Sequence, residues 1–205
     1  MCAAAVESGG LCDAVIGVGK VESTLRTTER LVRLHGPSGL DRARPEWLLL
    51  VGVCGAYPGS DLAVGELCVV AEDRLADEGV GLAGDGFTGI AAMGLGEEGP
   101  VRGDDERGPA IARRLGIREV AGATVSTCSA SEERSRGLAR RTGAQVETME
   151  GAAVLMVCRH FGVPAVQLRA VSNRTGERAS AGWDLQGALA RLHAAVRGLK
   201  EEHGW

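Results

Sequence analysis

The sequence predicts a single α/β domain in which helices cover both faces of a mixed β-sheet. Short apolar runs alternate along the chain with amphipathic stretches, and the predicted elements follow the order βαββ…βαβαβα. No internal repeat or low-complexity tract interrupts that order. A length of 205 residues is typical of one domain, so we expect residues 1–205 to form a single unit.

The first half of the chain predicts three strands, one helix and one long loop. Residues 13–19 (DAVIGVG) predict a buried strand that ends in glycine. The helix that follows should place Val21, Leu25, Thr28 and Val32 on one face. Residues 47–53 (WLLLVGV) predict a strand covered on both faces, and residues 64–73 predict another. Residues 79–108 hold ten glycines and predict a long, functional loop.

The second half predicts three further strands and three helices. The strands are expected at residues 118–128, 144–150 and 163–172, and a helix at residues 151–161. Ser129 and Glu132 form a potential capping box for a helix that runs to about Gly143. The last helix should start at Asp184 as N-cap, because apolar residues then recur at helical spacing: Leu185, Leu189, Leu192, Val196 and Leu199.

The composition excludes several classes of function. A hydrophobic fraction of 44% and a mean hydropathy of +0.01 are typical of a soluble globular protein. The net charge of −4 and the six aromatic residues argue against nucleic acid or a membrane surface as partner. No apolar run could span a bilayer, and the first residues do not resemble a signal peptide, so we expect a cytoplasmic protein.

The cysteines and histidines do not indicate a cofactor. The six cysteines form no C-x-x-C pair, and we expect all of them to be reduced and mostly buried, including Cys54 and Cys128. The four histidines lack metal-ligand spacing and are expected at the surface. We therefore predict neither a metal nor another cofactor.

Four segments, in this order, resemble the nucleoside phosphorylase/nucleosidase superfamily. They are GVGKVEST (17–24), LLVGVCGAY (49–57), VETMEGAAV (146–154) and LRAVSN (168–173). The resemblance covers nearly the whole chain. It implies a nucleoside phosphorylase-like three-layer α/β/α fold, a small purine nucleoside as ligand, no cofactor, and assembly as a homo-oligomer.

Within this superfamily, the segment N-R-x-G-x-R…W (173–183) is most similar to the futalosine hydrolases. This similarity implies hydrolysis of the N-glycosidic bond of futalosine, release of hypoxanthine, and a role in menaquinone biosynthesis. Methylthioadenosine/adenosylhomocysteine nucleosidases are the next most similar group. A catalytically silent nucleoside-binding protein of the same fold is a third hypothesis.

The resemblance also assigns roles around the sugar. Glu150 stands where a strand passes into a helix, and a carboxylate can accept hydrogen bonds from both ribose hydroxyls. Met149 would pack under the sugar. The backbone around Val53 and Gly55 would approach the sugar closely. Glu147 is either a second carboxylate of the site or an exposed side chain.

Further residues are assigned to the base, the water and the rest of the substrate. Ser172 and Asn173 would lie at the purine, where Asn173 matches an Asp of adenine-specific relatives. Glu7 is the candidate base for the attacking water, or else an exposed glutamate near the chain start. Phe87 would line the pocket, reach a neighbouring subunit or simply pack. Arg174 and Arg178 would bind a carboxylate or be solvated, and Trp183 would border the site.

Hydrolysis is favoured over phosphorolysis by two apolar residues. Phosphorylases of this superfamily carry an Arg two residues before the first glycine of this segment and a Ser directly after it. The corresponding residues here are Leu50 and Val53. Apolar side chains cannot hold a phosphate dianion.

Overall fold

The computed structural model describes residues 2–4, 12–35, 45–83, 86–176 and 182–203. An eight-stranded mixed sheet forms the centre, with strand order β10-β4-β8-β9-β3-β1-β2 and β7 paired to β4. Its strands are β1 (Cys2–Ala4), β2 (Ala14–Val15), β3 (Leu48–Ala56), β4 (Leu67–Leu75), β7 (Val101–Arg102), β8 (Arg118–Thr124), β9 (Val146–Thr148) and β10 (Ala165–Arg174). The predicted mixed sheet is thus confirmed.

The sheet also closes on itself, which the sequence did not predict. Strand β10 pairs with β4 on one side and with β3 on the other, so β10, β4, β8, β9 and β3 form a ring. The β3–β9 contact joins the ends of the two strands through the pairs Gly55↔Glu147 and Ala56↔Val146. This closure brings the end of β3 beside the end of β9.

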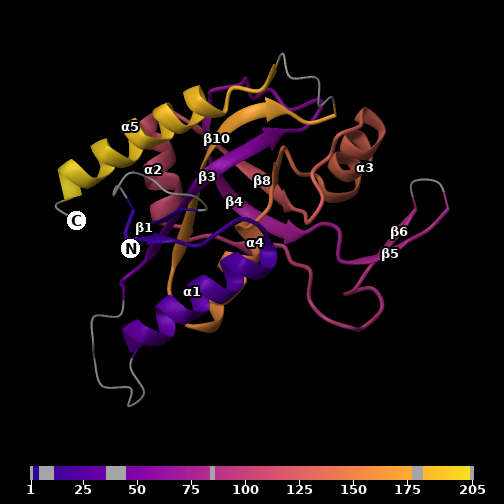
Figure 1. Cartoon of the computed structure of the whole chain (residues 1–205), viewed down its shortest axis with the longest axis horizontal. Coiled ribbons are helices and arrows are strands. Elements are labelled where there is room, and N and C mark those ends of the chain that lie inside the picture. The colour runs from indigo at the N-terminus through magenta and orange to yellow at the C-terminus, as the bar shows by residue number, and fades with distance from the viewer. Residues whose placement is uncertain (1, 5–11, 36–44, 84–85, 177–181, 204–205) are drawn as a thin grey trace.

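Helices lie on both faces of the sheet, as predicted (Figure 1). The sequence of β3 is continuously apolar because its side chains alternate between the two faces of the sheet and contact different helices on each face. Leu49 and Val51 belong to the core formed with α2 (Arg107–Leu115) and α5 (Leu185–His203). Leu48 and Leu50 belong to the core formed with α1 (Lys20–His35) and α4 (Gly151–His160).

Helix α1 buries a different face from the one predicted. Its buried residues are Ser23, Thr27 and Leu31, whereas Val21 is 84% exposed. Leu25 and Val32 are also exposed. The strand predicted just before α1 is reduced to the two residues of β2. The apolar periodicity is therefore real, but it marks a surface stripe instead of a core contact.

Four further elements, β5, β6, α2 and α3, differ from the prediction. The segment predicted as a long loop contains a two-stranded hairpin, β5 (Gly79–Gly81) and β6 (Phe87–Gly89), which projects from the body of the molecule (Figure 1). It also contains the start of α2, which the sequence reading missed. Helix α3 (Glu132–Thr142) begins two residues later than predicted, because its N-cap is Ser131, whose side chain accepts a hydrogen bond from the Arg134 N–H. Ser129 instead contacts the site described below.

Candidate active site

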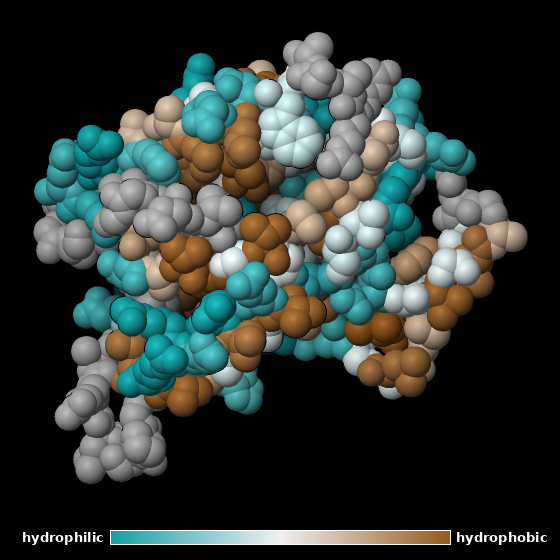
Figure 2. All heavy atoms as spheres, viewed as in Figure 1, coloured by the Kyte–Doolittle hydropathy of each residue, from teal (hydrophilic) through white to brown (hydrophobic). Residues whose placement is uncertain are grey.

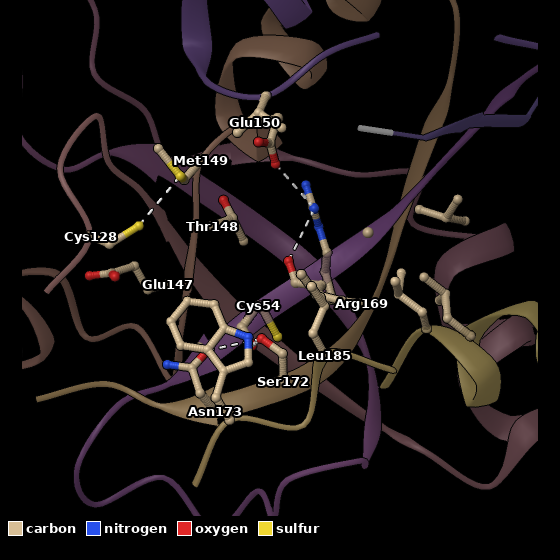
Figure 3. A pocket seen from close by; sticks show the side chains of 18 of the residues that line it. Cys54, Cys128, Glu147, Thr148, Met149, Glu150, Arg169, Ser172, Asn173 and Leu185 are labelled. Atoms are coloured by element: carbon tan, nitrogen blue, oxygen red, sulfur yellow. Dashed lines mark hydrogen bonds and ion pairs between the residues drawn. The ribbon is translucent and has the colours of Figure 1, made fainter. Parts of the chain in front are cut away.

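A cavity of about 590 Å³ lies where β3, β9 and β10 end (Figure 3). This volume lies within the range typical of small-molecule sites. The predicted residues Val53, Gly55, Met149, Glu150, Ser172 and Asn173 all line it. Residues far apart in the sequence are therefore brought together as the resemblance implied. The loop after β8 and one face of α5 complete the wall: Ser126–Ala130, Leu185, Leu189, Leu192, His193 and Val196.

Glu150 is one of two buried acids that line this cavity. It stands at the start of α4, is 4% exposed, and its side chain does not cap the helix. Its Oε1 accepts a hydrogen bond from the Gly19 N–H at 3.0 Å, and its Oε2 accepts one from Arg169 Nη1 at 3.2 Å. Each carboxylate oxygen can accept two hydrogen bonds, so each keeps one acceptor direction. Two neighbouring hydroxyls of a sugar require that number.

Arg169 lines the cavity, although the sequence did not single it out. It is fully buried in β10, and its Nη1 also donates to the Val53 carbonyl at 3.3 Å. Its side chain lies over Gly52, where any Cβ would collide with Nη1. Figure 3 shows Arg169 and Glu150 pointing toward each other across the cavity wall. An arginine inside the apolar run AVQLRAVS is the signal that could have revealed it, because an arginine is almost never fully buried unless paired.

Glu147 is buried and lines the cavity, which decides between the two alternatives for this residue. Its Oε1 accepts from the Ser129 N–H at 2.9 Å. Its Oε2 accepts from the Ser129 hydroxyl and from the Tyr57 hydroxyl at 3.1 Å. Burial and the adjacent Glu147 raise the pKa of Tyr57, so the phenol keeps its proton and donates. Glu147 therefore fixes the loop 126–130 to the sheet.

Ser172 and Asn173 lie at the end of β10, where the pairing with β3 is irregular. The Ser172 hydroxyl is within hydrogen-bond distance of both the Asn173 Oδ1, at 2.9 Å, and the Cys54 carbonyl, at 3.2 Å. Asn173 Nδ2 donates to the Arg174 carbonyl at 3.0 Å. These contacts fix which end of the amide is the acceptor. Asn173 is only half-buried, and its amide borders the cavity.

The part of the cavity that α5 lines is apolar. Leu185, Leu189, Leu192 and Val196 line it from α5, and Trp183 borders it as predicted. Asp184 caps this helix, because its Oδ1 accepts from the Gly187 N–H at 2.8 Å. His193, which was predicted at the surface, is half-buried and also lines this part of the cavity.

Only some of the remaining predicted residues lie at the cavity. Phe87 is on β6, where the Arg141 guanidinium lies 4.1 Å from its ring centre, and it is not among the residues that line the cavity. Arg174 lines the cavity, is exposed, and donates to the Leu62 carbonyl. Glu7 and Arg178 fall outside the described residues. The two positions that hold phosphate in phosphorylases carry apolar side chains here. Leu50 is in the core, and Val53 lines the cavity.

The cysteines only partly follow the prediction. Cys12 is disulfide-bonded, so the expectation that all six are reduced is wrong. Cys54, Cys68 and Cys158 are buried, unbridged thiols as expected, whereas Cys128 is exposed and lies 3.4 Å from the Met149 sulfur. Cys12 and Cys128 both line the cavity, so neither is simply a core residue.

The described part of the chain contains neither a metal-ligand cluster nor a membrane-spanning helix. No cluster of three or more histidine, cysteine, aspartate or glutamate side chains there could hold a metal ion. Among the same residues, no helix is long and apolar enough to cross a membrane.

The fold and the site define a class of protein: the chain belongs to the phosphorylase superfamily, which it matches over residues 4–200. A futalosine hydrolase of Thermus thermophilus is 37% identical over 195 residues, which cover 92% of this chain and 80% of the relative. An aminodeoxyfutalosine nucleosidase of Helicobacter pylori is 29% identical over 171 residues, or 82% of this chain and 69% of the relative.

The fold is also similar to a solved structure. The 5′-methylthioadenosine/S-adenosylhomocysteine nucleosidase of Helicobacter pylori superposes with a TM-score of 0.74 at 22% identity. The match covers 92% of this chain and 78% of that structure. At this identity the match establishes the three-layer α/β/α fold.

Proposed function

We propose that this protein hydrolyses the N-glycosidic bond of futalosine and releases hypoxanthine, as a step of menaquinone biosynthesis. The observation that carries the proposal is the geometry of Glu150, a buried carboxylate with one acceptor direction left on each oxygen at the cavity wall. The 37% identity to a futalosine hydrolase along most of the chain selects this substrate among purine nucleosides.

Different residues of the cavity bind the sugar, the purine and the 5′ substituent of the substrate. Glu150 accepts hydrogen bonds from the two ribose hydroxyls, Met149 packs under the sugar, and the backbone at Val53 and Gly55 lies against it. Ser172 holds the Asn173 amide, which binds the purine. The apolar wall of α5 receives the 5′ substituent, with Arg174 or Arg178 near its carboxylate.

The reaction passes through a sugar with oxocarbenium-like character while negative charge develops on the leaving purine. N7 of the leaving purine gains a proton from solvent water, and the Asn173 carbonyl accepts a hydrogen bond from the resulting N7–H while its amide NH₂ donates to the O6 of hypoxanthine. The fixed Glu150 carboxylate lies beside the positive charge that develops on the sugar. Glu7 is proposed as the base that activates the attacking water.

Water, and not phosphate, is the proposed nucleophile. A phosphate dianion needs a cation and hydroxyl or N–H donors, whereas Leu50 and Val53 are apolar. Cleavage should therefore proceed in phosphate-free buffer and yield a reducing sugar instead of a sugar 1-phosphate.

One experiment tests substrate and nucleophile together. The purified chain is incubated with futalosine, methylthioadenosine and inosine, each with and without phosphate, and the free base is measured. We expect hypoxanthine from futalosine in both buffers. Strict dependence on phosphate would contradict hydrolysis, and release of base only from methylthioadenosine would favour the nucleosidase alternative. The apolar α5 wall supports that alternative, because it would also fit an alkylthio group.

We also propose that the protein acts as a homo-oligomer and is a single cytoplasmic domain over residues 1–205. The exposed apolar stripe formed by Val18, Val21, Leu25 and Val32 supports assembly, because it would be covered by a second copy (Figure 2). Light scattering after size-exclusion chromatography gives the mass. A monomer at micromolar concentration would contradict this part of the proposal.

A further inference from the structure

A chain of buried polar side chains runs under the cavity from β4 to Glu150. Asp73 of β4, 1% exposed, accepts a hydrogen bond from Gln167 Nε2 at 3.0 Å. Gln167 Oε1 accepts one from Arg169 Nε at 2.8 Å, and Arg169 Nη1 donates to Glu150. Asp73 and Gln167 are outside the cavity, since neither is among the residues that line it.

The direction of each hydrogen bond in this chain is fixed by Asp73. A carboxylate only accepts, so it holds the NH₂ end of the Gln167 amide. The carbonyl end must then face the Arg169 Nε, which only donates. If the amide turned over, its NH₂ group would face another donor. Asp73 therefore determines the orientation of Gln167, and Gln167 determines where the guanidinium of Arg169 lies.

Asp73 is itself held firmly by two threonines. Thr124 Oγ1 donates to Asp73 Oδ1 at 2.9 Å, and Thr148 Oγ1 donates to Asp73 Oδ2 at 3.2 Å. The same Thr124 oxygen accepts a hydrogen bond from the Ala152 N–H at 2.8 Å. Because Ala152 belongs to the first turn of α4, this contact also anchors the backbone that carries Glu150.

The surrounding backbone leaves room for this chain. Gly151 follows Glu150 directly, and a Cβ there would collide with both Asp73 and Gln167. A Cβ at Gly52 would collide with Arg169 on the other side. Packing therefore explains the glycine of the motif M-E-G. A larger residue after Glu150 would displace the hydrogen-bonded side chains of Asp73 and Gln167.

We propose that Asp73 and Gln167 are positioning residues, which hold Arg169 and through it the Glu150 carboxylate in the orientation that binds the ribose hydroxyls. The contact from Arg169 occupies one acceptor direction of Glu150 Oε2 and leaves the other toward the cavity. Without Gln167, the guanidinium loses the acceptor that fixes it along the strand. The carboxylate then no longer has one fixed orientation.

This inference rests on the proposed function, and a double-mutant cycle between Gln167→Met and Glu150→Gln tests it. Methionine preserves the length of Gln167 but removes its hydrogen bonds. In the wild-type background we expect Gln167→Met to lower kcat/KM by about tenfold, which is within the coupling range of residues in one network. In the Glu150→Gln background the same change should lower kcat/KM less than twofold.

A second readout separates positioning from loss of stability. The inhibition constants of inosine and 2′-deoxyinosine are compared, because their ratio reports contact with the 2′-hydroxyl. Gln167→Met should bring this ratio toward one. Ile111→Ala, in the core on the α2 side and outside the cavity, should lower the melting temperature but leave the ratio unchanged. Asp73→Asn, of equal size, should behave as Gln167→Met does and replaces it if that variant does not fold.

The outcomes distinguish the inference from the function beneath it. Equal losses of kcat/KM in both backgrounds, or an unchanged inosine ratio in both variants, would overturn the positioning role while leaving the activity established. A wild-type chain that releases no base from futalosine, methylthioadenosine or inosine would overturn the proposed function itself.

Discussion

At the scale of single residues, Glu150 combines burial with two existing hydrogen bonds and two remaining acceptor directions. Glutamine at this position keeps the shape, but its NH₂ group can no longer accept from a hydroxyl. We expect Glu150→Gln to reduce transition-state stabilisation by roughly 2–4 kcal/mol, or about 30- to 1000-fold in kcat/KM. Initial rates with futalosine measure this. Glu133→Gln, on the exposed side of α3, is the control. Near wild-type kcat/KM in Glu150→Gln would contradict the assignment.

Asn173 carries the prediction about the purine. Its Oδ1 is oriented by Ser172, which leaves a carbonyl acceptor for N7–H and an NH₂ donor for the O6 of hypoxanthine. An adenine nucleoside offers an amino group at this position, and a mispaired buried group costs ~1–3 kcal/mol. We therefore expect hypoxanthine nucleosides to be preferred by roughly tenfold to hundredfold.

Exchanging this residue should change the preference. Asn173→Asp should shift the ratio of kcat/KM toward adenine nucleosides, because a protonated carboxyl can donate to N7 while its other oxygen accepts from the 6-amino group. Asn173→Ala, which removes both groups, should lower both rates and bring the ratio toward one without favouring adenine. Equal kcat/KM for matched hypoxanthine and adenine nucleosides, unchanged in Asn173→Asp, would remove the argument for futalosine.

The sequence motifs predicted residues that line the cavity, whereas the buried side chains beneath it were not predicted. Glu150, Met149 and Asn173 stand in recognisable motifs, and all three line the cavity. Arg169 and Gln167 occur within an apolar strand, where local pattern indicates only a core. Their partners, Glu150 and Asp73, lie 19 and 94 positions away, and such pairings depend on the sheet topology. Periodicity alone does not contain that information.

At the scale of elements, α5 supplies the apolar wall of the cavity and depends on its first turn. The Asp184 carboxylate accepts from the Gly187 N–H, which would otherwise lack an acceptor within the helix. Asp184→Ala should cost about 1 kcal/mol of unfolding free energy. Asp184→Asn, which can still cap, should cost much less. Urea denaturation of the three proteins gives the values, and equal stability of Asp184→Ala and wild type would contradict the cap.

Helix α1 shows that the spacing of apolar residues does not by itself predict which face of a helix is buried. In α1, the face with Val21, Leu25 and Val32 is the more apolar, yet Ser23 and Thr27 are buried beside Leu31. A helix face that contacts a second subunit has the same apolar spacing as a face that contacts the core, so the two kinds of face have the same sequence pattern. In contrast, α5 was predicted correctly, because its N-cap and its leucine spacing agree.

At the scale of the whole molecule, closure of the sheet buries a carboxylate away from bulk solvent. Asp73 lies inside the ring formed by β10, β4, β8, β9 and β3, against the start of α4. The ring could not be predicted from local sequence, because it depends on the pairing of β10 with both β3 and β4. Burial raises the pKa of Asp73, although hydrogen bonds from Gln167 and Thr124 oppose the shift.

This burial gives the folding stability a defined pH dependence. The ordinary pKa of the side chain is 3.8, and the folded value is higher, so the folded state binds this proton more tightly than the unfolded state. The stability that comes from the protonated form is therefore fully present below pH 3.8 and is lost as the pH rises through the folded pKa.

Asp73→Asn lacks this titration. The unfolding free energy of the wild type minus that of Asp73→Asn should thus fall as the pH rises from 3.8, and should become constant above the folded pKa. Urea denaturation of both proteins from pH 3.5 to about 7 measures the difference, in which the titration of all other groups cancels to first order. A difference that rises with pH would mean that the hydrogen bonds outweigh burial and that the folded chain favours the ionised carboxylate.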